Sequence, residues 1–209
     1  MTTMTPDQLL TSAHDVIDGA LPVYDAVLTE HLVLNAPPET VFRVARDLDF
    51  LTVRSPLVTV LMAARMLPAK LLRRSVEAPQ ALRLAADPSV LPGWLSLGEV
   101  PDRELAFGAV GKFWQADIEW LDVPIEQFAD FAEPGWGKIA CHLLVRPDGP
   151  GRSVLTYECR TGTTDLTSRA MMTRYWWLIR PFVGYVLRAV LRTIRRNAEA
   201  AVVTHPGTG

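Results

Sequence analysis

The sequence predicts an α+β domain in which a run of antiparallel strands is followed by one long C-terminal helix. Segments rich in β-forming residues, separated by glycine and proline, fill most of residues 94–161. The flanking regions show instead the spacing of amphipathic helices. Residues 171–196, MMTRYWWLIRPFVGYVLRAVLRTIRR, combine apolar, aromatic and arginine residues over a length typical of a long helix.

The composition is that of a globular protein with a substantial core. Of the 209 residues, 49% are hydrophobic and 21% are charged. The net charge of -2 argues against a general nucleic-acid-binding protein, because such domains are usually strongly basic. The first residues lack the basic and apolar regions of a signal peptide, so we expect a cytoplasmic protein.

The first part of the chain is predicted to hold three helices and one strand. The sequence Thr5-Pro6-Asp7 has the capping hydroxyl, proline and acid that are typical of a helix start. Pro37 and Pro38 separate the strand from the helix after it. The predicted elements are a helix over 6–18, a strand over 24–34, a helix over 39–48 and a helix from Ser55-Pro56 onward.

Five strands are predicted in the second part of the chain, over residues 94–100, 105–114, 117–124, 138–146 and 154–161. Gly108 and Gly111 lie inside the second of these strands, where a bulge or the close approach of a ligand is the usual reason for glycine. The sequence Pro147-Asp-Gly-Pro-Gly151 predicts a tight turn between the last two strands.

The last two predicted strands also suggest a register. A hairpin folded about Pro150 has three adjacent cross-strand pairs: Leu143 with Tyr157, Cys141 with Cys159, and His142 with Glu158. One face is then apolar and the other polar, as expected of an antiparallel sheet with one buried face. The two cysteines are too few for a disulfide scaffold, and we expect them to be buried thiols in a reducing compartment.

The C-terminal segment predicts a long amphipathic helix that begins near Leu166 and is capped by Thr164 or Asp165. At about 100° per residue, one face carries Met172, Tyr175, Trp176, Ile179, Val183, Val186, Leu187, Val190 and Ile194. The opposite face carries Arg174, Arg188, Arg192, Arg195 and Arg196. Pro181 should bend the helix, and the central arginines make a membrane span too costly.

Trp177 and Tyr185 fall on the arginine face of this predicted helix. One interpretation is that the bend at Pro181 shifts the helix phase and buries one of them. The other is that tryptophan, tyrosine and arginine together form a membrane-surface or partner-binding face. Arginines near a helix C-terminus also complement the helix dipole, which is a purely structural use.

The order of elements, together with the stretch LVLNAPPETVF, resembles the START-like helix-grip superfamily (SRPBCC), with its polyketide cyclase/dehydrase and lipid-transport branch. The Ala-Pro-x-Glu-x-Val-Phe turn lies at residues 36–42, and further similar stretches are Leu97-Gly98-Glu99, VGKFW, LTYECRT and RYWWLIRPF. The resemblance covers about residues 24–200. It implies a curved antiparallel sheet wrapped around the C-terminal helix, with a hydrophobic cavity between them.

Members of that superfamily bind sterols, lipids, hormones or polyketides, and some catalyse cyclisation, dehydration or hydrolysis, so the resemblance names no ligand. We expect three parts in this chain: an N-terminal helical extension over 1–22, a single START-like domain over 23–201 and a flexible tail over 202–209. The N-terminal helix lies outside the usual pattern of the superfamily.

The sequence has few candidates for catalysis. No histidine or cysteine spacing suits a metal, and no glycine-rich loop suits a phosphate, so we expect neither a metal nor a cofactor. His142, Glu158 and Arg160 share the polar face of the predicted hairpin. In a cavity they could perform acid/base chemistry, whereas on the outer face they would form a solvated ion pair; the apolar alternation favours the outer face.

The leading interpretation is therefore a carrier or sensor that binds an apolar or aromatic small molecule, or a lipid, between the sheet and the C-terminal helix. The predicted contacts are Phe107, Phe113, Leu143, Tyr157, Cys159, Met172, Tyr175, Trp176 and Ile179. Plain core packing is the alternative use of these aromatic residues. Two other functions stay open: a polyketide cyclase/hydrolase-type enzyme that uses His142, Glu158 and Arg160, and a peripheral membrane protein that uses the arginine face.

Overall fold

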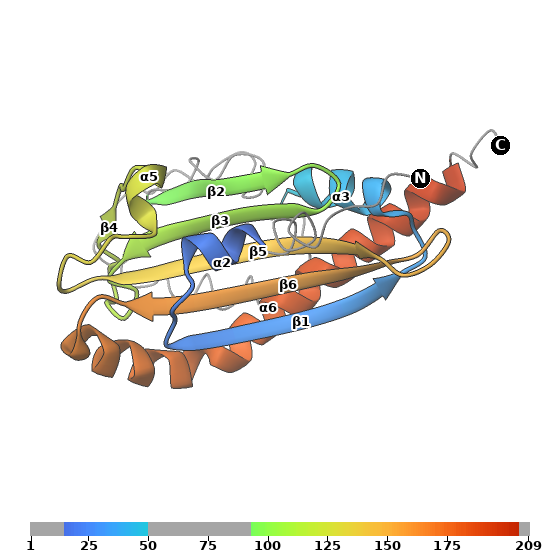
Figure 1. Ribbon diagram of the computed structural model, residues 1–209. Helices are drawn as coiled ribbons and strands as arrows, with labels where there is room; N and C mark the ends of the chain where they lie inside the picture. The colour runs from blue at the N-terminus through green and yellow to red at the C-terminus, as the bar shows by residue number, and fades with distance from the viewer. Residues whose placement is uncertain (1–14, 50–92, 205–209) are drawn as a thin grey trace, which may run out of the picture.

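A computed structural model describes residues 15–49 and 93–204 of the chain (Figure 1). The helices are α2 (Val16–Ala20), α3 (Pro38–Arg46), α5 (Ile125–Phe128) and α6 (Leu166–Thr204). The strands are β1 (Ala26–Leu34), β2 (Trp94–Val100), β3 (Glu104–Gly111), β4 (Trp120–Leu121), β5 (Gly137–Pro147) and β6 (Ser153–Thr163).

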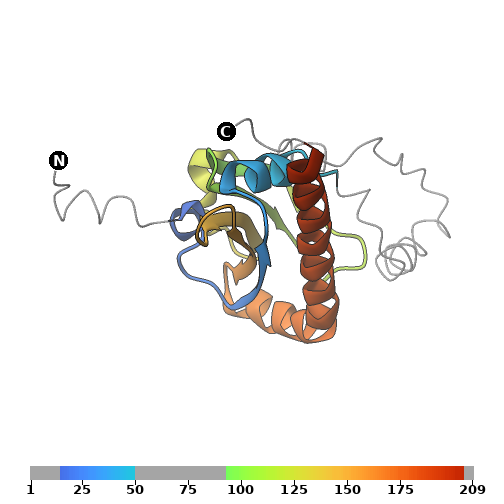
Figure 2. The same cartoon turned by 90° about the vertical axis from the view of Figure 1, so that its right-hand side faces the viewer.

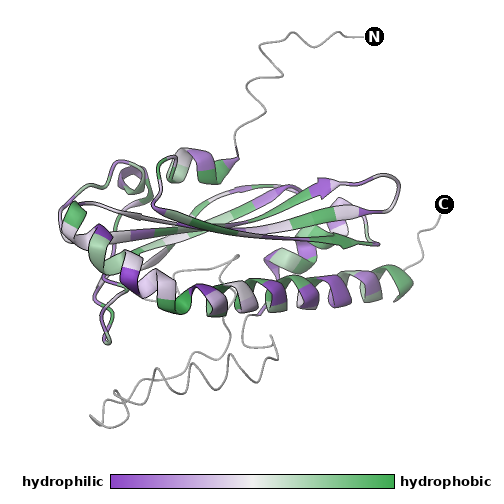
Figure 3. Ribbon diagram, turned by 90° about the horizontal axis from the view of Figure 1, so that it is seen from below, coloured by the Kyte–Doolittle hydropathy of each residue, from purple (hydrophilic) through white to green (hydrophobic). Residues whose placement is uncertain are grey.

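The strands form one antiparallel sheet in the order β1-β6-β5-β3-β2, with β4 paired to β3. The predicted register of the β5–β6 hairpin is confirmed, since Cys141 faces Cys159 and His142 faces Glu158. Helix α6 lies on one side of the sheet and α2 on the other (Figures 2 and 3). The predicted α+β helix-grip fold is thus confirmed. We call the side of the sheet that faces α6 the inner face and the opposite side the outer face.

The main core lies between the inner face and α6. Leu187, Val190 and Ile194 of α6 are buried in one cluster with residues of β3, β5 and β6 such as Leu143 and Leu155. These side chains alternate along the strands and recur at helical spacing along α6, which is why the two elements bury each other's apolar sides. Helix α6 packs mainly against β1, β6 and α3.

Helix α3 closes one end of this core. Pro38 occupies the first helical turn, where its missing N–H group is not needed. Val41, Phe42 and Ala45 are buried against the sheet and α6, as their spacing predicts, while Val44 is half-buried. The stretch that follows β1 therefore acts as a turn that brings α3 back over the core.

The outer face is covered by the short helices α2 and α5. Ile17 and Leu21 of the α2 region and Phe128 of α5 are buried against this face. A side chain at Gly108 would meet Phe128 and the Ile139 carbonyl oxygen, with 2.7 Å from an added Cβ to that oxygen. This glycine therefore admits the close packing of α5 and is not explained by a ligand.

Helix α6 is capped by Asp165, one of the two predicted caps, and contains the proline at which the sequence predicts a bend. Asp165 Oδ1 accepts from the backbone N–H groups of Thr167 and Ser168 at 2.8 and 3.0 Å. Pro181 lies inside the helix, and the two halves of α6 run in clearly different directions (Figure 2). Proline causes such a bend because it lacks an N–H donor and its ring clashes with the preceding turn.

Three details differ from the sequence prediction or lie beyond it. The sequence predicts a strand over 117–124, but β4 comprises just two of these residues, Trp120 and Leu121, which pair with Gly111 and Val110 of β3. Helix α6 extends to Thr204, inside the predicted tail. The predicted helix from Ser55-Pro56 and most of the predicted helix over 6–18 lie outside the described residues.

Within the described ranges, none of the helices has the combination of length and apolar character that crossing a membrane requires.

The capping role of Asp165 predicts a pH-dependent contribution to stability. Its hydrogen bonds, above all those with the Ser168 side chain and backbone, lower the pKa of Asp165 to about 2. Because the pKa is lower in the folded state, ionised Asp165 stabilises the fold. This stabilisation is complete above the unfolded-state pKa of about 4, and it is lost as the pH falls towards 2. The Asp165→Ala variant should therefore be less stable than the wild type at pH 7, and the difference should shrink near pH 2. Urea denaturation at both pH values measures this, and a difference that does not change with pH would contradict it.

Candidate functional site

Five aromatic rings form a continuous row across the inner face of the sheet. Tyr157 and Phe107 have ring centroids 6.4 Å apart, Phe107 and Trp94 are 5.9 Å apart, Trp94 and Trp120 are 6.4 Å apart, and Trp120 and Phe113 are 5.8 Å apart. These distances are typical of interacting aromatic pairs in tilted or edge-to-face geometry. We call Tyr157, Phe107, Trp94, Trp120 and Phe113 the aromatic row. The first four lie on β6, β3, β2 and β4, and Phe113 follows the end of β3.

The first half of α6 extends this aromatic surface. Met172 is buried with Phe113 and Ala109, and Tyr175 and Trp176 pack against the same cluster. Trp94 belongs to both this cluster and the main core. The aromatic row therefore connects the packed part of the inner face with the first half of the long helix.

The structure brings eight of the nine predicted ligand contacts into these two adjoining clusters; the ninth, Ile179, belongs to neither. Phe107, Leu143, Tyr157 and Cys159 are buried in the main core, and Phe113 and Met172 are buried in the second cluster. The three contacts from the next turns of α6 are half-buried: Tyr175, Trp176 and Ile179. Their role in ligand binding stays a prediction, but their placement on one connected surface agrees with it.

The contacts that the sequence predicts omit three residues of this surface: Trp94, Trp120 and Ile139. Trp94 is paired with Ala109, which has the same strand parity as Phe107, so it shares the inner face with them. A register shift between Ser96 and Gly98 interrupts the β2–β3 pairing. Because a bulge changes which side chains share a face, the strand sequence alone could not assign Trp94. Ile139 is two residues from Cys141 on β5, so the alternation of side chains along this strand could have placed it on the inner face.

Tyr157 provides a polar group within the aromatic row. Burial is the main cause that raises the pKa of Tyr157 well above its usual range, and the neighbouring Cys141 and Cys159 add to this effect. The phenol is therefore neutral and can both donate and accept a hydrogen bond. No hydrogen bond joins this hydroxyl to another residue within the described part of the chain, although Tyr157 is 5% exposed.

Cys141 and Cys159 face each other as free, buried thiols, as predicted. A hydrogen bond with Cys159 is the main cause that raises the pKa of Cys141 well above its usual range, and burial also raises it. A thiol that stays protonated is a poor nucleophile. We therefore assign the two cysteines to packing beneath the aromatic row.

The polar residues proposed for catalysis lie on the outer face and do not act as one group. His142 is opposite Glu158 in the backbone register, but its Nδ1 contacts Glu104 Oε1 at 2.7 Å. The expectation of a solvated pair between His142 and Glu158 is therefore wrong, because His142 is 3% exposed beneath α2 and has a different partner. Glu104 lies on β3, the other neighbour of β5, and its carboxylate is completely buried.

Glu104 connects the sheet to the start of α2. Its carboxylate accepts from the Val16 backbone N–H at 2.8 Å and from the Ile17 N–H at 3.4 Å. Burial acts to raise the pKa of Glu104, but the hydrogen bond from His142, the two backbone N–H groups and the charge of His142 lower it overall. The carboxylate thus satisfies the unpaired N–H groups of a helix start, which is a structural role.

Arg160, together with Glu158, also holds the α2 region against the outer face. Arg160 forms salt bridges with Asp18 at 2.7 Å and with Glu158 at 2.6 Å, and donates to the Leu21 carbonyl oxygen. Arg103 similarly pairs with Asp15 at 2.7 Å. These contacts attach α2 and the residues after it to the outer face, so the structure separates His142, Glu158 and Arg160 from the aromatic row.

Two open grooves are lined by described residues, and neither contains a predicted ligand contact. The larger, of about 800 Å³, lies between α3 and the end of α6, beside Arg43, Asp47 and Asn197. The smaller, of about 280 Å³, lies between α2 and α5 on the outer face.

Comparisons with known proteins find similar folds at low identity. A protein of Thermus thermophilus is 10% identical, with a TM-score of 0.33, and the match covers 84% of this chain and 99% of that one. A Rhizobium loti protein is 12% identical, with a TM-score of 0.36 and coverages of 79% and 94%. CalU16 from Micromonospora echinospora is 14% identical, with a TM-score of 0.28 and coverages of 85% and 86%. No protein-family model matches the sequence, and no curated protein matches it.

The burial of Glu104 predicts that its loss is far more damaging than the loss of Glu158. The Glu104→Ala variant leaves His142 and two helix N–H groups without their acceptor, which should lower the free energy of unfolding by about 3 to 5 kcal/mol. Glu158→Ala is the matched control, because it removes a partly exposed carboxylate from the same face and should cost about 1 kcal/mol or less. Urea denaturation measures both values, and equal losses would show that the buried contact has no special role.

Proposed function

We propose that this protein binds an apolar or aromatic small molecule, or a lipid chain, between the aromatic row and the first half of α6, as a carrier or sensor. The observation that supports this most directly is the connected aromatic surface formed by the row and by Tyr175 and Trp176. The resemblance of the chain to START-like proteins, whose members hold such ligands between sheet and helix, points the same way.

The energetics favour a ligand at this surface. Tyr175, Trp176 and Ile179 are half-buried, as are Trp94 and Trp120 of the aromatic row. Removing a further ~100 Å² of their apolar surface from water would contribute about 2.5 kcal/mol. Aromatic pairs add about 0.5 to 1.5 kcal/mol when a ring is stacked at the usual distance. A ligand with an aromatic or polycyclic body would gain from both effects.

The hydroxyl of Tyr157 supplies a means of orienting such a ligand. An apolar surface alone gives affinity with little specificity, whereas one well-placed polar group fixes the position of a bound molecule. A neutral phenol suits a hydroxyl or carbonyl group on the ligand. We therefore expect a ligand with an apolar body and a single polar group near one end.

The two adjacent tryptophans of α6 offer a matched test. Trp176 packs toward the aromatic row, whereas Trp177 is 82% exposed on the other side of the helix. Trp176→Ala should weaken binding of a fluorescent apolar probe by roughly tenfold, the effect of losing one aromatic anchor. Trp177→Ala should leave the affinity nearly unchanged. Fluorescence titration of both variants, after circular dichroism has confirmed their fold, gives the comparison.

Native mass spectrometry of the freshly purified protein, followed by solvent extraction, tests the same proposal without a chosen probe. A reproducible small-molecule adduct that is lost in Trp176→Ala and retained in Trp177→Ala would support it. Equal binding of the probe by both variants, or an adduct that persists in both, would contradict it.

A further inference from the structure

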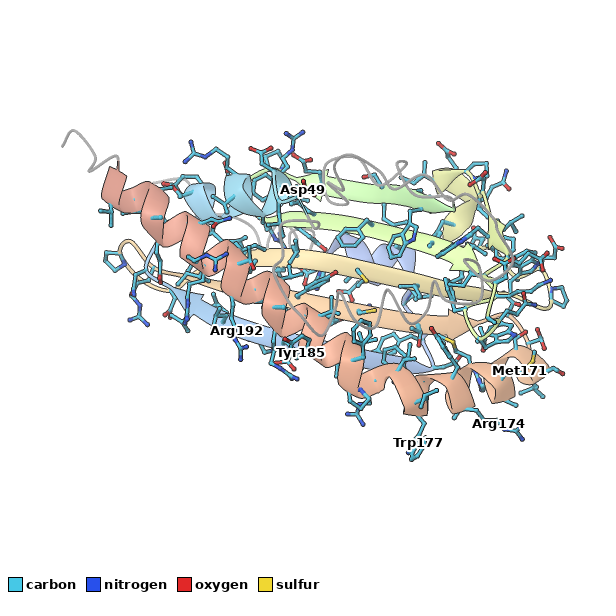
Figure 4. The ribbon with its side chains drawn as sticks, turned by 180° about the vertical axis from the view of Figure 1, so that it is seen from behind. Asp49, Met171, Arg174, Trp177, Tyr185 and Arg192 are labelled. Atoms are coloured by element: carbon cyan, nitrogen blue, oxygen red, sulfur yellow. The ribbon has the colours of Figure 1, made fainter. Side chains whose placement is uncertain are left out.

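A second surface of α6 faces away from the sheet, at the bend of the helix. Trp177 is 82% exposed and Leu178 is 70% exposed, and Met171, Arg174 and Pro181 lie on the same side of the helix. In Figure 4, Trp177 points away from the sheet at the bend, with Arg174 near it on the outer side of α6. We call these five residues the bend patch: Met171, Arg174, Trp177, Leu178 and Pro181.

The backbone at the bend explains why this patch stands out from the molecule. Pro181 has no N–H group to donate to the carbonyl oxygen of Trp177, four residues earlier. Pro181 is itself exposed, so it lies on the outer, convex side of the bend, where helices usually face solvent. The bend therefore presents Trp177 and Leu178 outward, while Trp176 turns toward the aromatic row.

The charges that α6 itself carries around the bend patch are of one sign. Helix α6 contains seven arginines, and its sole acidic residue is Glu199, near its end. Arg169 and Arg188 are neutralised by Asp25 and Glu30 of the β1 region. Arg174 and Arg180 lie three residues before and after Trp177, and neither forms an ion pair within the described part of the chain.

We propose that the bend patch docks onto the surface of an anionic lipid bilayer. Trp177 and Leu178 would enter the boundary between headgroups and acyl chains, and Arg174 and Arg180 would contact lipid phosphates. Exposed tryptophan and leucine flanked by arginine, without acid, are the composition of an interfacial helix. This inference goes beyond the proposed ligand binding and does not depend on it.

Charge and size favour a bilayer over the other occupants of such a surface. A symmetric contact with a second copy would bring Arg174 and Arg180 close to their equivalents, and like charges repel at short range. A stable protein partner usually covers about 800 Å² on each side, which a single exposed helix stripe does not offer. An anionic bilayer needs no matching shape and complements the positive charge.

The bend patch lies at a different position along α6 from the membrane-facing surface that the sequence predicts. The arginine face predicted from the sequence includes Arg188 and Arg192, but Arg188 is engaged with Glu30. Tyr185 is half-buried and makes contacts of its own, so it belongs to the fold. The bend patch is thus confined to the first half of α6, beside Pro181.

Vesicle co-sedimentation with the full chain tests the proposal. The wild type should bind vesicles of phosphatidylcholine that contain phosphatidylglycerol, should bind pure phosphatidylcholine much more weakly, and should be released by high salt. Neutralising both flanking cations in the Arg174→Gln, Arg180→Gln variant should weaken binding by about thirtyfold, since each cation near the surface contributes about 1 kcal/mol.

Two further variants separate insertion from charge. The Trp177→Ser, Leu178→Ser variant should lose most binding to the anionic vesicles. Val203→Ser is the matched control, because Val203 is 80% exposed on the same helix but lies beside Glu199 and not beside the bend. It should bind as the wild type does, and circular dichroism should confirm that all variants are folded.

Three results would overturn the proposal. One is equal binding to vesicles with and without phosphatidylglycerol. Another is unchanged binding in the Trp177→Ser, Leu178→Ser variant. The third is a dimer in light scattering that dissociates when Trp177 and Leu178 are replaced, which would assign the bend patch to a second copy of the chain. Probe binding at the aromatic row is measured without vesicles, so each proposal can fail without affecting the other.

Discussion

One helix cannot cover a sheet that is five strands wide, and much of this structure follows from that constraint. A helix with its side chains is about 10 to 12 Å across, while neighbouring strands are about 4.8 Å apart, so a helix covers about two strands. Helix α6 lies mainly over β1 and β6. The inner face beyond these two strands carries most of the aromatic row, which α6 meets through Met172, Tyr175 and Trp176 of its first half.

The outer face is organised by the need to satisfy buried polar groups. Glu104 and His142 are nearly inaccessible to water, and a buried carboxylate is costly without partners. The start of α2 supplies two N–H donors and His142 supplies a third, while Arg160 and Arg103 hold the residues around them. These buried and partly buried ionisable side chains of the outer face are therefore used to attach α2 to the sheet.

Helix α6 has two separate sides as a result. Its inner side contributes core residues along most of its length and half-buried aromatic residues in its first half. Its outer side carries the bend patch, and Pro181 determines the direction in which that patch points. Trp176 and Trp177 are adjacent in the sequence, yet one packs toward the sheet and the other is exposed, which is the consequence of helical spacing at a bend.

The sequence alone determined the features that depend on local periodicity: the order of the main strands and the long helix, the register of the β5–β6 hairpin, the apolar side of α6, its start near Leu166 and its bend at Pro181. Tertiary structure decided the rest. The partner of His142 lies on a third strand, the side of Trp94 depends on a bulge in β2, and the exposure of Trp177 depends on the path of α6 after Pro181. Periodicity places side chains on a face, but contacts between distant segments decide what covers that face.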